Sequence, residues 1–105
     1  MMHAMREAFD QRDWDQTLIL FQEMDDLKVL SRNTLVESVC LAARAMAALN
    51  NRPGSRKLLK VLDKVQLTKP VHYALMAQAY MDLKNYKETA RLCELVVALQ
   101  ENKQN

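Results

Sequence analysis

Two histidines, His3 and His72, and two cysteines, Cys40 and Cys93, are the side chains best suited to acid–base, nucleophilic or metal chemistry. Each of these kinds of chemistry needs a positioned pair, triad or ligand set. The spacing supplies none, because the chain has no C-x-x-C, H-E-x-x-H or P-loop motif and neither histidine lies among clustered carboxylates. We therefore predict no catalytic residue, no metal site and no cofactor. We interpret both cysteines as buried, reduced thiols.

The composition predicts a single helical domain. The 105 residues are rich in strong helix formers, and they contain one glycine and two prolines, too few for the tight turns of an all-β fold. The net charge of +2, from 15 basic and 13 acidic residues, gives no electrostatic argument for binding DNA or RNA. No apolar run approaches the length of a membrane span. Reduced cysteines favour a cytoplasmic, reducing compartment.

Capping residues divide the sequence into six helical segments, with a clear break at residues 50–55. A helix N-terminus favours a side chain that accepts hydrogen bonds from its free N–H groups. The predicted caps are Asp13 for the second segment, Asn33 or Thr34 for the third, Thr68 for the fifth and Asn85 for the sixth.

An apolar pattern occurs three times along the chain. The third copy reads Y-x2-M-A-x2-Y from residue 73 and T-x3-C from residue 89. The second reads V-x2-A-A-x2-M from residue 39 and S-x3-L from residue 55, and the first reads M-x2-A-M-x2-A from residue 1 and T-x3-F from residue 17. Positions that match when the three copies are aligned are called equivalent below. The paired helices of each unit should cross closely at Met5 and Thr17, at Ala43 and Ser55, and at Ala77 and Thr89.

These patterns resemble the tetratricopeptide repeat, whose signature W-x2-L-G-x2-Y and A-x3-F recurs about every 34 residues. Here alanine or methionine replaces the glycine, threonine or serine replaces the small alanine, and four extra residues lie around Asp25 to Leu30. The resemblance implies an all-α domain over residues 1–105. It consists of three antiparallel helix–turn–helix units, at about 1–31, 32–67 and 68–102, stacked as a short solenoid. A helical bundle without true repeats is the alternative fold.

In this family the first helix of each unit lines a concave surface that binds a partner. The resemblance implies a groove there, formed by Arg6, Phe9, Cys40, Leu41, Arg44, Ala74, Leu75, Gln78 and Met81. An apolar middle with a charged rim suits an amphipathic or apolar helix of another protein. The two arginines alone do not make the clamp that some members of the family use to hold an acidic tail.

The last predicted helix carries a second apolar surface, formed by Leu92, Leu95, Val96 and Leu99. The first helix of the same unit cannot bury all four side chains. Repeat stacks usually close with a polar capping helix, and no such pattern follows here. We therefore expect this end to contact another chain or to self-associate.

The leading interpretation is a non-catalytic module that binds or chaperones a helical protein. In length and repeat number the chain is similar to the small tetratricopeptide-type chaperones of type III secretion needle subunits. A scaffold subunit or fragment of a larger complex is one alternative. An RNA-binding fragment is another, because residues 13–24 look like the second helix of a pentatricopeptide repeat. The base-reading positions of that family match His3, Leu41 and Leu75, and leucine cannot hydrogen-bond a base, so nucleic acid is the less favoured partner.

Overall fold

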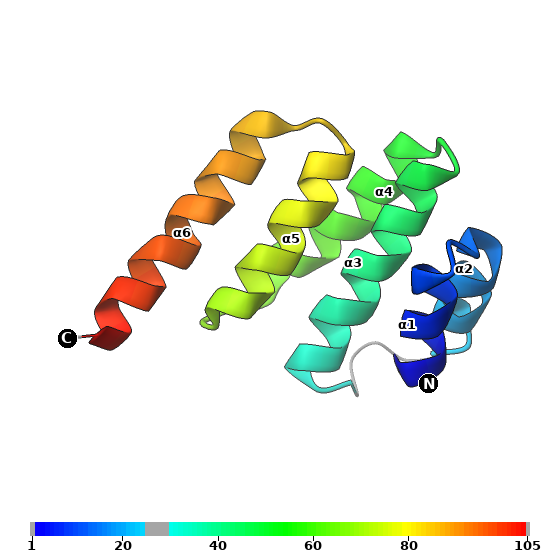
Figure 1. Ribbon diagram of the computed structural model, residues 1–105, viewed down its shortest axis with the longest axis horizontal. Coiled ribbons are helices and arrows are strands. Elements are labelled where there is room, and N and C mark those ends of the chain that lie inside the picture. The colour runs from blue at the N-terminus through cyan, green and yellow to red at the C-terminus, as the bar shows by residue number, and fades with distance from the viewer. Residues whose placement is uncertain (1, 25–29, 105) are drawn as a thin grey trace.

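The computed structural model describes residues 2–24 and 30–104, and helices make up most of this part of the chain (Figure 1). The elements are α1 (Met2–Asp10), α2 (Trp14–Gln22), α3 (Arg32–Ala48), α4 (Arg52–Leu59), the 3-10 helix η2 (Lys60–Lys64), α5 (Pro70–Asp82) and α6 (Tyr86–Gln104). The described residues contain no strand, so the predicted all-α class is confirmed. The extra residues predicted around Asp25 to Leu30 fall mainly on residues 25–29, outside the described residues.

Two predicted helix caps are confirmed. At the start of α2, the Asp13 carboxylate accepts a hydrogen bond of 3.1 Å from the backbone N–H of Gln16. At the start of α6, the Asn85 side-chain oxygen accepts one of 3.3 Å from the N–H of Glu88. Each cap satisfies one of the donors that the first turn of a helix leaves free.

The other two predicted caps are wrong. Ser31 caps α3, because its Oγ accepts the 3.2 Å hydrogen bond from the N–H of Thr34. Asn33 and Thr34 therefore lie inside the first turn. Thr68 caps nothing, because α5 begins at Pro70 and has no side-chain cap. Proline at the first helical position carries no N–H, so it leaves one donor fewer to satisfy.

The predicted break at residues 50–55 is shorter than the sequence suggested. Asn51 caps α4, and its Oδ1 accepts a hydrogen bond of 3.1 Å from the N–H of Gly54. A Cβ atom at residue 54 would lie only 2.5 Å from Asn51 Nδ2, so the glycine permits this close cap. The second half of the predicted break is therefore the first turn of a helix.

Three turns of the same geometry connect α1 to α2, α3 to α4 and α5 to α6. Each contains a left-handed residue, Arg12, Asn50 or Lys84, with φ of 60°, 67° and 59°. The residue after it donates its N–H to a carbonyl near the end of the preceding helix: Asp13 to Ala8, Asn51 to Met46 and Asn85 to Tyr80. This hydrogen bond satisfies a free carbonyl at the helix end and reverses the chain. The three left-handed residues occupy equivalent positions in the three copies of the pattern.

The helices pack mainly against their neighbours in sequence. α2 packs on α1, α4 packs on α3, and α6 packs on α5. α3 also packs against both α1 and α2, and α5 packs against α3. In Figure 1, α3 and α5 lie side by side and run in the same direction, whereas α6 runs back along the far side of α5.

The six predicted crossing residues are all buried. Met5, Thr17, Ala43 and Ser55 are fully enclosed, and Ala77 and Thr89 nearly so. In the last unit the Thr89 hydroxyl donates to the carbonyl of Asn85 at 2.9 Å and lies 3.4 Å from the carbonyl of Ala77. This close approach of α6 to α5 leaves no space for a larger side chain on α5.

Candidate functional site

The chemically capable side chains lie apart in four different settings. His3 is exposed and lies 3.2 Å from the carboxylate of Glu7. His72 is buried, with Nε2 2.6 Å from the Asn33 side-chain oxygen. Cys40 is buried, and burial raises the pKa of its thiol to about 12. Cys93 is exposed, so the prediction of two buried thiols is wrong for this residue.

Within residues 2–24 and 30–104, no group of three or more histidine, cysteine, aspartate or glutamate side chains could hold a metal ion. Two hollows of about 520 Å³ each lie next to one another and share the side chains of Arg44 and Asp82.

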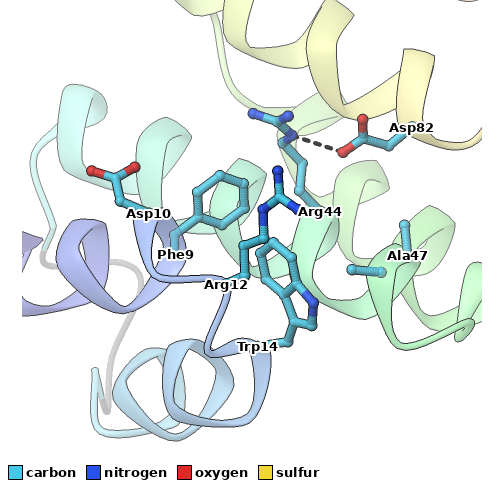
Figure 2. Close-up of a pocket in the computed structure, with 8 residues that line it drawn as sticks. Phe9, Asp10, Arg12, Trp14, Arg44, Ala47 and Asp82 are labelled. Carbon is cyan, nitrogen blue, oxygen red and sulfur yellow. Dashed lines mark hydrogen bonds and ion pairs between the residues drawn. The ribbon is translucent and has the colours of Figure 1, made fainter.

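The first, here called the Phe9 hollow, is lined by Phe9, Asp10, Arg12, Trp14, Arg44, Ala47, Ala48 and Asp82. Figure 2 shows the side chains of Phe9, Arg12 and Trp14, at the end of α1 and the start of α2, opposite Arg44 and Asp82. The two aromatic rings meet edge to face, with centroids 5.2 Å apart. The lining is therefore aromatic at one side and charged at the other.

Arg44 connects three helices across the Phe9 hollow. Its guanidinium lies 4.9 Å from the centroid of the Phe9 ring on α1, a cation–π distance. Its Nε donates to Asp82 at 2.7 Å, and its Nη1 donates to Gln78 at 3.2 Å, both on α5. Because Arg44 is committed to these contacts, it stabilises the surface more than it offers a free charge to a ligand.

A similar contact joins α1 to α3. Arg6, at the position equivalent to Arg44, donates from Nε and Nη2 to Glu37 at 2.6 Å each. The hydrogen bond from Arg6 holds the pKa of the Glu37 carboxyl below its usual value. Leu41 and Leu75, predicted to line the middle of the groove, are both half-buried. The predicted groove residues therefore include two arginines that bridge neighbouring helices.

The second hollow, here called the α5–α6 groove, is the more apolar. Its lining is Arg44, Ala74, Ala77, Gln78, Met81, Asp82, Thr89, Cys93, Val96 and Val97. Met81 is 48% exposed and Val97 is 52% exposed. Another hollow adjoins it through Ala74 and Val96 and adds Val71, which is 56% exposed. These side chains form an apolar strip along both helices that the described residues leave open.

The structure divides the predicted groove residues between these surfaces. Phe9 and Arg44 line the Phe9 hollow. Ala74, Gln78 and Met81 line the α5–α6 groove together with Arg44.

Two predicted surface residues are corrected. Cys40 is only 2% exposed, because it belongs to the core formed by α3, α4 and α5, so it cannot line an open groove. Leu92 is fully buried in the same core, whereas Leu95, Val96 and Leu99 are half-buried.

Several lining residues escaped the sequence analysis, among them Arg12, Trp14, Cys93 and Val97. Cys93 carried a usable signal, because it stands in T-x3-C where the earlier copies have S-x3-L and T-x3-F. The first two copies have a large apolar residue at this position. A small residue there in the third copy indicates that its side chain does not fill the core of that helix pair. No comparable signal pointed to Arg12, whose placement depends on its left-handed backbone.

Comparisons with family models, with curated proteins and with solved structures give no match. None of the helices over the described residues is long and apolar enough to cross a membrane.

Proposed function

We propose that the chain is a non-catalytic interaction module built as three tetratricopeptide-like units. Three features support the repeat. The turns at Arg12, Asn50 and Lys84 have the same left-handed geometry at equivalent positions. The six crossing residues are buried, and each helix pair packs on the next. A bundle without repeats has no reason to place the same turn at matching points of all three copies.

The module binds a helical segment of another protein, and the observation that carries this proposal is the α5–α6 groove. Exposed Met81 and Val97 and the half-buried Ala74 and Val96 form a continuous apolar strip between two helices. Burying such a strip releases about 25 cal/mol per Å² of apolar surface. Methionine adapts its shape to varied apolar partners, which suits the rim of a groove that receives a helix.

Protein is favoured over RNA as the partner for two reasons. The positions that would read bases in a pentatricopeptide protein include Leu41 and Leu75, which are half-buried and carry no hydrogen-bonding group. The net charge of +2 also provides little attraction for a phosphate backbone.

Affinity capture with two matched variants tests this function. Tagged wild-type protein, Val97→Asp and Lys60→Asp are each used to capture partners from the native source, followed by mass spectrometry and titration calorimetry with the purified partner. Val97 and Lys60 are both exposed, so neither change disturbs the core. An aspartate in the groove would be desolvated without a counter-ion, whereas the charge at residue 60 stays in water.

We expect one protein to be captured by the wild type and by Lys60→Asp but lost with Val97→Asp. Equal capture by all three proteins, or sequence-selective RNA binding at physiological salt, would overturn the proposal. The behaviour of the captured partner also distinguishes a chaperone from a scaffold subunit. A chaperoned partner aggregates when purified alone, whereas a partner held by a scaffold is soluble.

A further inference from the structure

The open groove has a filled counterpart inside the molecule. Leu59, in α4, is fully buried in a core that includes Met76 and Ala77 of α5. Cys93, in α6, is the equivalent residue and is exposed. α5 packs on α3 and contributes to this core, whereas none of the described helices takes the equivalent place beside α5 and α6. The core that α3, α4 and α5 share, here called the filled junction, shows what kind of helix could occupy the open α5–α6 groove.

One small residue, Ala79, lies on the face that α5 turns toward α3. His72 bonds Asn33 of α3, so this side of α5 lies against α3. Ala79 follows two turns later on the same side, and it is 1% exposed. Ala45 is the equivalent residue of α3 and is fully buried. An alanine at this place lets the incoming helix approach the preceding pair closely.

α1 breaks this rule. Its residue equivalent to Ala45 and Ala79 is Glu7, whose side chain is 62% exposed and lies beside His3. If α1 of a second copy entered the α5–α6 groove, this carboxylate would leave water for an apolar strip with only His3 of its own helix beside it, which is costly. Head-to-tail stacking of identical chains is therefore disfavoured, although the groove is open.

Polar contacts between the first helices α1, α3 and α5 indicate a second property of a helix that would fit the groove, besides the alanine. Arg6 of α1 donates to Glu37 of α3, and Arg44 of α3 donates to Asp82 of α5. Gln78 is the equivalent residue of α5. Its side-chain oxygen accepts a hydrogen bond from Arg44, and its amide N–H groups are the donors it has left. A helix in the α5–α6 groove can match them with an acceptor.

From these contacts we propose that the α5–α6 groove binds an α-helix of a different polypeptide that runs in the direction of α5. The helix presents an alanine-sized residue where α3 has Ala45 and α5 has Ala79. It also carries a carboxylate or amide oxygen opposite Gln78. This inference rests on the proposed function and specifies the partner: an alanine-faced amphipathic helix, and not a second copy of this chain.

Cys93 reports directly on occupancy of the groove. Its exposed thiol lies in the lining, whereas Cys40 is buried and serves as an internal reference. The probe is a synthetic peptide with the sequence of residues 68–84, which contains α5 and no cysteine. A hydrocarbon staple between the positions of Ala74 and Gln78 keeps the peptide helical. The staple lies on the side of the helix opposite His72 and Ala79, so it leaves that face free. The full chain is treated with iodoacetamide, and alkylation of each cysteine is followed by mass spectrometry.

We expect the peptide at saturation to slow alkylation of Cys93 by about tenfold or more, while Cys40 stays unmodified throughout. The same peptide with Ala79→Glu imitates Glu7 and should bind about tenfold more weakly or worse. Circular dichroism confirms that both peptides are helical. Failure of the first peptide to protect Cys93, or equal protection by both peptides, contradicts the proposal.

Two further outcomes separate this inference from the proposed function. If a native partner is captured in a Val97-dependent way but the residue 68–84 peptide does not protect Cys93, the proposed occupant is wrong and the interaction function stands. If neither occurs, both fail. Sedimentation that detects a dimer abolished by Val97→Asp identifies a second copy as the occupant and overturns the inference.

Discussion

Leu59 of α4 is fully enclosed in a core to which α3 and α5 also contribute, whereas Cys93 at the equivalent place of α6 is exposed. The turns within the two helix pairs have the same geometry and the same capping chemistry. The local sequence therefore forms the groove, and the presence of a neighbouring helix decides whether it becomes core or surface. The predictions below test this difference between the filled junction and the open one.

Truncation should have its largest effect at the filled junction. Leu59→Ala removes a fully buried side chain and leaves a cavity, so it should lower the free energy of unfolding by about 2–5 kcal/mol. Cys93→Ala, at the equivalent place, should change it by less than about 0.5 kcal/mol. Urea denaturation measures both. Similar losses for the two variants would mean that Cys93 is covered by something in solution.

Enlarging the crossing residue of the last pair should be the next most damaging change. Ala77→Leu places a larger side chain where α6 approaches α5 closely, and overpacking of this kind costs about 1–3 kcal/mol. Ala98→Leu, on the exposed side of α6, is the matched control and should be nearly neutral. If thermal melts showed the two variants to be equally stable, the crossing point of α5 and α6 would lie elsewhere.

The polar contact of the filled junction should give stability a dependence on pH. Burial, with help from the positive charges of Lys69 and Arg32, lowers the pKa of His72 in the folded chain. The unfolded chain then takes up a proton at a higher pH than the folded one. Stability should be complete above the ordinary histidine value of about 6.5 and fall as the pH drops through the lowered pKa.

Denaturation midpoints measured across this pH range check the prediction for His72. His72→Gln should flatten the profile between pH 7 and pH 5, whereas His3→Gln, at an exposed residue, should leave it nearly unchanged. If stability still fell steeply with pH in the His72→Gln variant, the pH dependence would come from the carboxylates and not from His72.

The smallest effect is expected at the Arg44 bridge. Arg44 and Asp82 are both partly solvated, so their coupling in a double-mutant cycle should be about 0.2–1 kcal/mol and should shrink in high salt. Loss of the Phe9 contact adds a further ~0.5–1 kcal/mol to Arg44→Ala alone. A coupling several times larger would mean that this bridge is shielded from water.

The helix class was predictable because helix-forming residues, few turn formers and some caps act locally. Asp13 and Asn85 were found because each precedes its helix directly and has the right chemistry. Ser31 was missed in favour of Asn33 and Thr34, which have equally suitable side chains. The backbone conformation of a single residue decides which of these neighbours becomes the cap. The amino-acid composition contains no information about that conformation.

The site was predictable only in part, for a different reason. The periodicity identified α5 residues such as Gln78 and Met81, which do line the open groove. It could not say that Cys40 would be covered and Cys93 exposed, because that depends on which helix lies next to each pair. Arg44 was assigned to a groove rim, but its bridges to Phe9 and Asp82 join segments that are distant in the sequence and carry no sequence signature.

The attachment of α6 has a consequence for hydrogen exchange. α3 packs against four other helices, whereas α6 packs mainly against α5. α6 can therefore detach while the rest of the molecule stays folded, and its amides should exchange through this local opening, before those of α3. A helix bound between α5 and α6 would hold the detachable element in place. Partner binding should then slow exchange along the whole of α6, including the turns that the partner never touches.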